Sequence, residues 1–252
     1  MKNPKVILIT GASSGIGRAL ALAYAAPGVT LLLAGRDQTR LDDIASTCRA
    51  KGAKAECCAI PVTDPAFPQA LLALDDATPI DLVIANAGIS GGTGGDGESD
   101  VQLRRILSIN LDGTFNTVNP LLPRFAARKK GQVALMSSMA GFRGMPTAPA
   151  YSVSKMAVRA YGEALRPLLK QDGVDVNVIF PGFIRTPLTK VNNFPMPFLM
   201  DADEAARFIV KGLAANHARI AFPWPMHLLA RLLAALPLAL GDFILARAPK
   251  KG

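Results

Sequence analysis

The stretch from Gln132 to Lys155, QVALMSSMAGFRGMPTAPAYSVSK, decides how the rest of the chain is interpreted. Its apolar run Val133–Met136 predicts a short buried strand. Its last residues predict the start of a helix, on which Tyr151 and Lys155 are four positions apart and therefore share one face. An ammonium group beside a phenol favours the phenolate and lowers a pKa that is about 10 in water. The stretch thus predicts a proton-transferring tyrosine, although Tyr-x-x-x-Lys is also a common pair on helix surfaces.

Two adjacent serines, Ser137 and Ser138, follow the predicted strand. A hydroxyl at the end of this strand reaches the space in front of the phenol across the intervening loop. There it can hydrogen-bond the oxygen of a carbonyl or an alcohol. The position alone leaves both serines as candidates.

Composition favours one compact globular domain, because the chain has 252 residues and half of them are apolar. The three cysteines Cys48, Cys57 and Cys58 have neither a disulfide pattern nor metal-ligand spacing. His217 and His227 also lack partners at such spacing, so we expect no metal site. The N-terminal apolar run is short and leads into a glycine loop, unlike a signal peptide. We therefore expect a cytoplasmic protein.

The net charge is +9, which is compatible with nucleic acids, anionic membrane surfaces or phosphate-bearing ligands. The chain lacks zinc-finger spacing, and its short basic run is limited to residues 128–130. The sequence therefore disfavours nucleic acid as a partner.

The first predicted strand, Val6–Thr10, runs directly into Gly11-Ala-Ser-Ser-Gly15-Ile-Gly17, and residues 18–26 have helical composition. Strand, glycine loop and helix together are typical of a phosphate site. Glycines let the backbone approach a pyrophosphate, and the helix N-terminus supplies N–H groups and a positive dipole end. We therefore predict a dinucleotide site at the start of the chain.

The second predicted strand, residues 29–34, ends at Gly35, Arg36 and Asp37. At this place an acidic side chain selects NAD through the ribose hydroxyl, whereas an arginine accommodates the 2′-phosphate of NADP. We expect Arg36 to face the nucleotide and Asp37 to turn away, so the cofactor is predicted to be NADP(H). The alternative is that Arg36 is a solvated residue at the helix start.

The rest of the chain alternates between predicted strands and helices. The glycine-rich residues 91–99 are expected to form a surface loop, and Pro120 and Pro123 to interrupt a long helical region. The alternation indicates an α/β fold with a doubly wound parallel sheet and helices on both faces. The predicted elements are a helix at 41–51, a strand at 55–61, a helix at 68–74, a strand at 82–85, helical residues 100–128, a helix from Tyr151 to about Gln171 and a strand at 174–180.

These motifs occur in an order and spacing that resemble the short-chain dehydrogenase/reductase family over roughly residues 4–190. The Ser138-to-Tyr151 interval of 13 is as in that family, which favours Ser138 over Ser137. The resemblance implies a Rossmann-type sheet of about seven strands. The residues that match are Thr10-Gly-Ala-Ser-Ser-Gly-Ile-Gly17, Asn86-Ala-Gly88, Asn110, Ser138, Tyr151-x-x-x-Lys155 and Pro181-Gly182-x-x-x-Thr186.

The resemblance also implies roles for single residues. Tyr151 would be the general acid or base, and Lys155 would hold the nicotinamide ribose and lower the pKa of Tyr151. Ser138 would polarise the carbonyl, and Asn110 would fix a water that links Lys155 to solvent. The cofactor-binding residues would be Gly11, Ser13, Ser14, Gly15, Ile16 and Gly17 at the pyrophosphate, Arg36 at the 2′-phosphate, Asp64 at the adenine, Asn86, Ala87 and Gly88 at the ribose, and Pro181, Gly182, Ile184 and Thr186 at the nicotinamide.

The C-terminal part divides into a substrate lid and a tail. Residues 1–220 are interpreted as the catalytic domain, with a lid at about 188–214 whose residues Phe194, Met196, Phe198, Leu199 and Met200 favour an apolar substrate or ordinary core packing. The lid is expected to include a helix from Asp201 to Ala214, with Asp201 and Glu204 at capping-box spacing.

Residues 221–252 are apolar and basic, and they are not expected to form an independent domain. Their apolar stretch is too short and interrupted to span a bilayer. Residues 224–251 fit an interfacial helix on an anionic membrane or the face of a homodimer. The basic and aromatic residues behind this hypothesis are Trp224, Arg231, Arg247, Lys250 and Lys251.

Taken together, the sequence predicts an NADP(H)-dependent oxidoreductase that interconverts a hydrophobic ketone and a secondary alcohol. We expect a homo-oligomer, either a dimer or a tetramer. The alternative is a non-catalytic NADP(H)-binding sensor or scaffold, peripheral at the cytoplasmic membrane face.

Overall fold

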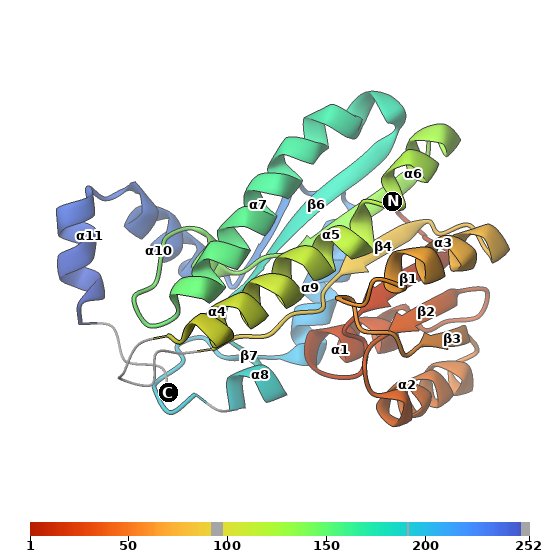
Figure 1. The fold of residues 1–252 in the computed structure, drawn as a ribbon, viewed down its shortest axis with the longest axis horizontal. Coiled ribbons are helices and arrows are strands. Elements are labelled where there is room, and N and C mark those ends of the chain that lie inside the picture. Colours follow the sequence, from red (N-terminus) through yellow and green to blue (C-terminus); the bar gives the residue numbers. More distant parts are fainter. Residues whose placement is uncertain (92–97, 191, 248–252) are drawn as a thin grey trace.

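A computed structural model describes the chain except for residues 92–97, 191 and 248–252 (Figure 1). The described residues form a seven-stranded, fully parallel sheet in the order β3-β2-β1-β4-β5-β6-β9. The Rossmann-type prediction is thereby confirmed. The strands are β1 Val6–Thr10, β2 Thr30–Ala34, β3 Lys54–Cys58, β4 Leu82–Ala85, β5 Gly131–Met136, β6 Val174–Pro181 and β9 Arg219–Phe222.

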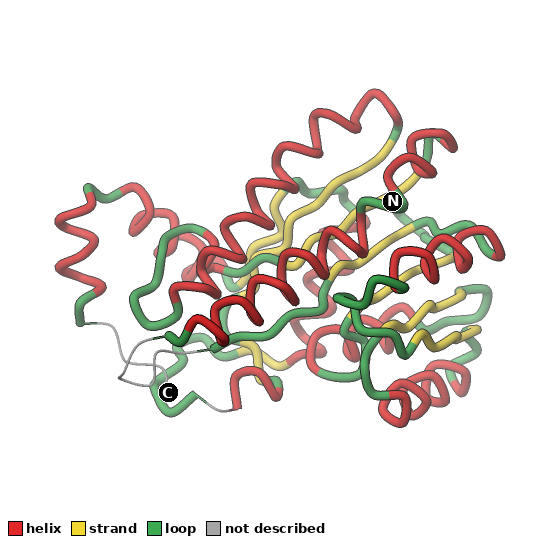
Figure 2. The backbone as a smooth tube through the Cα atoms, in the orientation of Figure 1, coloured by secondary structure: helices red, strands yellow, loops and turns green. Residues whose placement is uncertain are grey.

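The helices lie on both sides of this sheet, which occupies the centre of the molecule (Figure 2). A separate two-stranded ribbon pairs β7 Ile184–Arg185 with β8 Met200–Asp201. The α-helices are α1 Gly15–Tyr24, α2 Gln38–Ala50, α3 Phe67–Ala77, α4 Asp100–Leu107, α5 Gly113–Val118, α6 Leu122–Arg128, α7 Pro149–Leu169, α8 Pro187–Lys190, α9 Ala202–Ala214, α10 Trp224–Ala235 and α11 Leu238–Leu245.

Alternating side chains of the strands supply two cores. In β1, Ile7 and Ile9 face α1, α2 and α9, whereas Leu8 faces α3, α6 and α7. Residues two apart point to the same face of a strand, so a continuous apolar run can bury both faces. This pattern explains why the central strands β1 and β4 are almost entirely apolar runs.

The strand order reverses between β1 and β4, since β1 pairs with β2 on one side and β4 on the other. Ligands of doubly wound sheets bind outside the carboxyl ends of the strands at this reversal. All the loops with predicted site residues leave the sheet at those ends.

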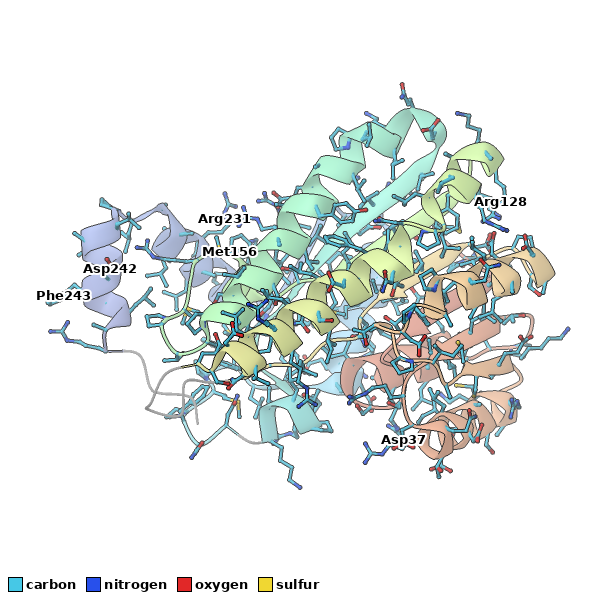
Figure 3. All side chains as sticks on the ribbon, in the orientation of Figure 1. Asp37, Arg128, Met156, Arg231, Asp242 and Phe243 are labelled. Atoms are coloured by element: carbon cyan, nitrogen blue, oxygen red, sulfur yellow. The ribbon has the colours of Figure 1, made fainter. Side chains whose placement is uncertain are left out.

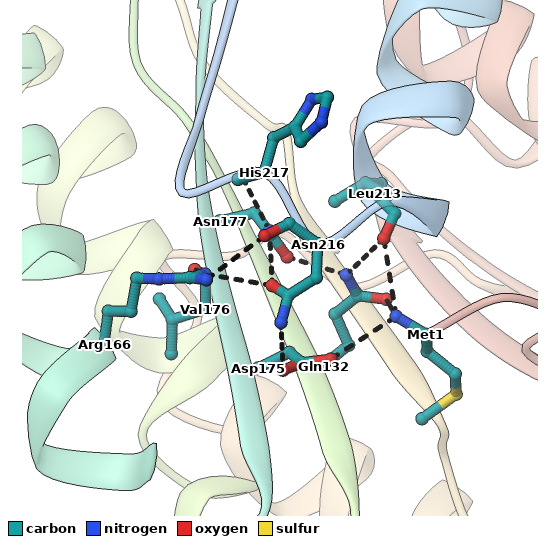
Figure 4. A network of polar contacts seen from close by, with 9 residues as sticks. All are labelled: Met1, Gln132, Arg166, Asp175, Val176, Asn177, Leu213, Asn216 and His217. Carbon is teal, nitrogen blue, oxygen red and sulfur yellow. Dashed lines mark hydrogen bonds and ion pairs between the residues drawn. The ribbon is translucent and has the colours of Figure 1, made fainter.

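A polar network stabilises the region away from these loops (Figure 4). The fully buried Gln132 donates from Nε2 to Asn177 Oδ1 at 2.7 Å, and Asn177 Nδ2 donates to the carbonyl of His217 at 2.8 Å. Arg166 Nη1 donates to Asn216 Oδ1 at 2.9 Å, which links α7 to the same network. These bonds satisfy polar groups that would be costly to bury unpaired.

The structure differs from the sequence-based expectations in the helical region 100–128 and at the start of α9. The chain breaks its long helical region at residues 119–121, as expected from the prolines, and it also includes a π-helical turn at Ser108–Asp112. The predicted capping box of α9 is absent: Asp201 makes no side-chain cap, because its carboxylate accepts from Arg185 Nε at 2.9 Å. The interpreted loop at 91–99 falls largely outside the described residues.

The end of the sheet and the tail differ from the sequence-based boundaries. β9 continues to Phe222, so the sheet crosses the interpreted boundary at residue 220. Beyond it, α10 and α11 are separated at Pro237. Among the described helices, none is long and apolar enough to cross a membrane. Lys250 and Lys251 of the tail hypothesis lie outside the described residues.

Candidate active site

A cavity of about 740 Å³ lies at the carboxyl ends of the strands. Most of the predicted site residues line it together, although they come from segments far apart in the chain. Within the described part of the chain, Gly17, Asp64 and Asn110 are the predicted site residues outside this lining. The predicted residues that line it are Gly11, Ser13, Ser14, Gly15, Ile16, Arg36, Asn86, Ala87, Gly88, Ser138, Tyr151, Lys155, Pro181, Gly182, Ile184 and Thr186.

The glycine loop takes a backbone path that requires glycine. Gly11 and Gly15 have φ values of +66° and +54°, in the left-handed region that side chains disfavour. Gly17 has a packing role, because a Cβ there would lie 2.2 Å from the carbonyl oxygen of Gly11. Ser14 makes no side-chain cap and the first turn of α1 has no acidic residue, so this helix N-terminus suits an anion.

The segment Asn86–Gly88 is bonded to the end of β1. Asn86 Nδ2 donates to the Thr10 carbonyl at 2.9 Å, and Thr10 Oγ1 accepts from the backbone N–H groups of Asn86 and Ala87 at 3.0 and 3.1 Å. These bonds hold the β4 loop beside the glycine loop. Both loops thereby present backbone to the same part of the cavity.

Arg36 and Asp37 point in different directions, as expected. Asp37 caps α2 by accepting from the backbone N–H of Arg40 at 3.1 Å, and it pairs with Arg40 Nε at 3.2 Å. Arg36 instead lines the cavity. The helix cap therefore occupies the acidic side chain, whereas Arg36 is the member of the pair that lines the cavity.

Asp64, predicted to bind the adenine, follows the cavity wall but is not among its lining residues. Its carboxylate accepts from the Ala66 backbone N–H at 2.8 Å, in the turn before α3. The cavity wall after β3 consists of Pro61, Val62 and Thr63. The turn engages one carboxylate oxygen of Asp64, and the contact with the adenine stays a prediction.

The two serines are distinguished by their hydrogen bonds. Ser137 is buried, and its hydroxyl donates to the Lys155 carbonyl oxygen at 2.8 Å. Ser138 Oγ accepts from the Ala140 backbone N–H at 3.2 Å and hydrogen-bonds the Tyr151 side chain. The hydroxyl beside the phenol is therefore that of Ser138, as the interval predicted.

Tyr151 and Lys155 share a poorly solvated wall of the cavity. Lys155 is 4% exposed, its Nζ donates to the Met136 carbonyl at 2.8 Å, and it lies 5.7 Å from the centre of the Tyr151 ring. Burial lowers the pKa of Lys155 to about 8. Burial raises the pKa of Tyr151, and the hydrogen bond with Ser138 opposes that rise. The net shift of the Tyr151 pKa is therefore upward and not downward as predicted, because burial disfavours the phenolate.

Asn110 is fully buried in the π-helical turn, beside Lys155 but outside the cavity lining. Its Oδ1 accepts from the Ile89 backbone N–H at 2.8 Å, and its Nδ2 donates to Ser154 Oγ at 2.9 Å. A Cβ added at Gly88 would lie 3.1 Å from Asn110 Oδ1 and 3.5 Å from Lys155 Nζ. Asn110 thus ties α7 to the β4 loop, at a π-turn of the kind common near functional sites.

The residues of the predicted lid lie in three environments: the cavity lining, the core and the solvent-exposed surface. Phe194 lines the cavity and packs edge-on against Phe183, with ring centres 5.9 Å apart. Met200 belongs to the core, and Phe198 is largely exposed. Core packing therefore holds for Met200, and the role of Phe194 toward an apolar substrate stays a prediction.

Sequence reasoning missed one wall of the cavity. Helix α10 contributes Met226, Leu229, Ala230 and Leu233, and a Cβ added at Gly182 would lie 2.7 Å from Met226 Sδ. The signal was the i, i+3, i+4, i+7 spacing of these residues, which marks one helix face. The tail was interpreted as an outer surface, and its inner face was not considered.

The comparisons with known proteins agree with this site. The family model described as short chain dehydrogenase matches residues 5–195. An oxidoreductase of Myxococcus xanthus, itself uncharacterized, is 39% identical over 240 residues, covering 94% of this chain and 95% of that protein. Because only 6% of this chain lies outside the match, the similarity continues into the tail.

Two solved structures are similar over nearly the whole chain. A short-chain dehydrogenase from Sphingobium yanoikuyae in complex with NADPH has a TM-score of 0.79 and 27% identity, covering 93% of this chain and 97% of that one. The bulky-bulky ketone specific alcohol dehydrogenase from Comamonas testosteroni has a TM-score of 0.78 and 25% identity, covering 94% and 96%.

Proposed function

This chain belongs to the short-chain dehydrogenase/reductase family, and we propose that it interconverts a bulky apolar ketone and its secondary alcohol with NADP(H). One observation carries the proposal. A single cavity is lined by a glycine loop suited to a pyrophosphate, by the hydrogen-bonded Ser138 and Tyr151, and by an apolar wall.

The residues of the cavity fit a dinucleotide. The positive φ values of Gly11 and Gly15 and the uncapped start of α1 form a cradle that side chains would fill. Gly15 is also close to Thr186, since a Cβ there would lie 3.2 Å from Thr186 Cγ2. Gly11–Ile16, Asn86–Gly88 and the Pro181–Thr186 turn would hold the cofactor, which supplies or accepts the hydride when bound.

The chain's own residues would handle the proton. A ketone oxygen becomes negative as hydride reaches its carbon, so hydrogen-bond donors beside it stabilise the transition state. Tyr151 is protonated at neutral pH because burial raises its pKa, and it would donate its phenolic proton to that oxygen. Ser138 would hydrogen-bond the same oxygen, and Lys155 and Asn110 would fix the position of α7.

NADP(H) is proposed over NAD(H) because of Arg36. Arg36 lines the cavity, whereas the adjacent carboxylate of Asp37 is used in the cap of α2. An arginine binds a phosphate dianion through charge-assisted hydrogen bonds. The relative from Sphingobium yanoikuyae, described as in complex with NADPH, gives independent support.

An apolar, bulky substrate is proposed because of the wall opposite the phenol. Phe142, Met145, Phe194 and the inner residues of α10 line it. The similarity to a bulky-bulky ketone specific enzyme supports the same substrate class. Since α10 is part of the wall, we interpret residues 221–252 as an extension of the catalytic domain.

The alternative, a non-catalytic NADP(H)-binding sensor or scaffold, would not need a proton donor in the cavity. Tyr151, Ser138 and Lys155 all line it, which favours the enzyme. Measuring turnover and binding separately distinguishes the two functions.

The first test is a fluorescence titration with NADPH and with NADH. In the Arg36→Ala variant we expect NADPH binding to weaken by about tenfold to a hundredfold, the value of a charge-assisted hydrogen bond, with NADH binding unchanged. Arg40→Ala is the matched control, because Arg40 is also exposed and near the start of α2 but does not line the cavity.

Each outcome decides a different part of the proposal. If Arg36→Ala and Arg40→Ala lost the same NADPH affinity, Arg36 would contribute only its positive charge and no specific contact with the 2′-phosphate. Preference for NADH in the unmodified protein would overturn the cofactor assignment. Tight binding without turnover of any bulky ketone or alcohol would favour the sensor or scaffold.

A further inference from the structure

Helix α10 has two apolar faces. Met226, Ala230 and Leu233 line the cavity, whereas Trp224, Leu228 and Leu232 are 73%, 50% and 57% exposed. None of its twelve residues, all within the described part of the chain, is buried. A soluble helix normally has a polar face toward water. The outer face of α10 is therefore a surface without an evident role in folding.

Helix α11 extends this exposed surface. It projects from one end of the molecule next to α10, with Phe243 at its outer side (Figures 1 and 3). Leu238, Leu240, Phe243 and Ile244 are exposed, while Gly241 and Leu245 are its buried residues. We call α10 and α11 together the apolar hairpin.

The cavity mouth opens on the apolar hairpin. Leu229 both lines the cavity and is 64% exposed, so it stands at the rim. On α10 it lies one turn before the outer residue Leu232, and residues three apart on a helix are neighbours on its surface. Any surface that covers the outer face of α10 would therefore also lie against the mouth.

Arg143 fixes the hairpin relative to the cavity. It lines the cavity, and its guanidinium donates to the carbonyls of Leu233 and Leu236 at 2.9 and 3.1 Å and to that of Leu238 at 3.3 Å. A Cβ added at Gly241 would lie 2.1 Å from this guanidinium, so the contact depends on glycine. The corner between the helices is thus bonded to the loop that follows Ser138.

The charges on the hairpin favour an anionic surface. Arg231 and Arg247 are exposed on α10 and just beyond α11, and the one acidic residue between Trp224 and Arg247 is Asp242. Asp242 lies 3.8 Å from the guanidinium of Arg143. Basic residues beside exposed Trp, Leu and Phe are typical of helices that lie in a lipid interface.

We propose that the apolar hairpin docks this protein on an anionic lipid surface and that its cavity mouth then faces the lipid. An apolar ketone would pass from the bilayer to Tyr151 without crossing water. This second part rests on the proposed function, whereas the docking does not.

A second copy of the chain fits the hairpin less well. Two apposed hairpins would together carry four arginines and two carboxylates, and each carboxylate already lies near Arg143 of its own chain. Like charges that face one another in an interface are unfavourable. Lipid phosphates provide the missing negative charge.

The single tryptophan of the chain, Trp224, reports directly on the hairpin. We would titrate the full-length protein with phosphatidylcholine vesicles, with and without phosphatidylglycerol, and follow tryptophan emission and flotation. We expect a blue shift and flotation with the anionic vesicles only. Arg231→Gln should weaken this binding by about fivefold, the effect of one basic residue at such a surface.

Leu232→Glu and Leu168→Glu form a matched pair for this experiment. Both leucines lie on helices and are exposed to a similar degree, 57% and 62%, but Leu168 is on α7, outside the hairpin. We expect Leu232→Glu to weaken vesicle binding by at least about tenfold and Leu168→Glu to leave it unchanged.

Several results would overturn the docking. These are equal binding of both variants, equal binding to neutral and anionic vesicles, and the absence of any shift. A blue shift without vesicles that grows with protein concentration would assign the hairpin to a second copy instead. Sedimentation of the same samples would detect that dimer.

The passage of substrate has its own readout. Leu232→Glu should raise KM for a ketone dissolved in anionic vesicles and leave KM for a water-soluble ketone unchanged. Unchanged KM in both assays would refute passage from the lipid. If vesicles bind but NADPH does not, the proposed function fails and the docking stands, so the two failures are distinguishable.

Discussion

Helices α7 and α10 line the same cavity but are built in opposite ways. α7 buries eight of its residues, among them Ser152, Ser154 and Lys155, and fixes its polar side chains by hydrogen bonds. α10 buries none of its residues and presents apolar atoms to both the cavity and the outside. We infer that the two helices have different tasks in the site. A proton donor must be held in place, whereas a wall for apolar molecules needs only shape and lack of charge.

The largest effect should follow from removing the proton donor of α7. We expect Tyr151→Phe to lower kcat by about a thousandfold with NADPH affinity unchanged, because a positioned general acid is worth that order of rate. Steady-state assays and NADPH titration measure the two quantities.

Tyr161→Phe is the control on the same helix, since the Tyr161 hydroxyl bonds Asn119 away from the cavity. Similar loss in both variants would show that the phenol of Tyr151 has no special role.

The buried cation of α7 should give stability a distinctive pH dependence. The pKa of Lys155 is lowered from 10.5 to about 8, so between these values the unfolded chain binds more protons at this site than the folded chain. Folding therefore becomes more favourable as pH rises from 8 to 10.5, by about 3 kcal/mol. In Lys155→Met that gain is absent, so the free energies of unfolding of the two proteins should diverge over this range.

Urea unfolding at several pH values measures the divergence. The other titrating groups are common to both proteins, so their effects cancel in the difference. Lys170→Met, at an exposed position just after α7, controls for the loss of one charge. Parallel curves for unmodified protein and Lys155→Met would show that Lys155 is not desolvated in solution.

A smaller effect on KM is expected from a substitution on the inner face of α10. Ala230→Leu narrows the cavity and should raise KM for a bulky ketone by about tenfold, leaving NADPH binding and a small ketone unaffected. Ala234→Leu on the exposed side of the same helix is the matched control. An equal change in both variants would mean that the inner face of α10 does not contact substrate.

The smallest effect should come from removing the hydrogen bonds by which Arg143 holds the corner between α10 and α11. Arg143→Met removes the donors to the carbonyls at the α10–α11 corner, and we expect amide exchange in α11 to accelerate by about tenfold. Exchange in α7 should not change. Hydrogen-exchange mass spectrometry distinguishes this from a general loss of stability, in which both helices would exchange faster.

Much of the site could be predicted because its motifs are local. The glycine loop, the Tyr151–Lys155 pair and Ser138 each depend on spacing along one segment, and all of them line the cavity. The Asp201 capping box was not formed, since this carboxylate had several partners within reach. The ion pair with Arg185 competed with the expected cap, and the folded geometry decided between them.

By itself the sequence determined the order of strands and helices as far as β6, the parallel sheet and the edge at which ligands bind. Periodic apolar runs and glycine turns act over a few residues, so they can be recognised without knowing the fold. The tertiary structure alone decided the last strand of the sheet, the directions in which the pKa values of Tyr151 and Lys155 shift, and the double role of α10. Burial shifts these pKa values, and it depends on which distant segments of the chain pack around a residue. The residues next to it in the sequence do not reveal those segments.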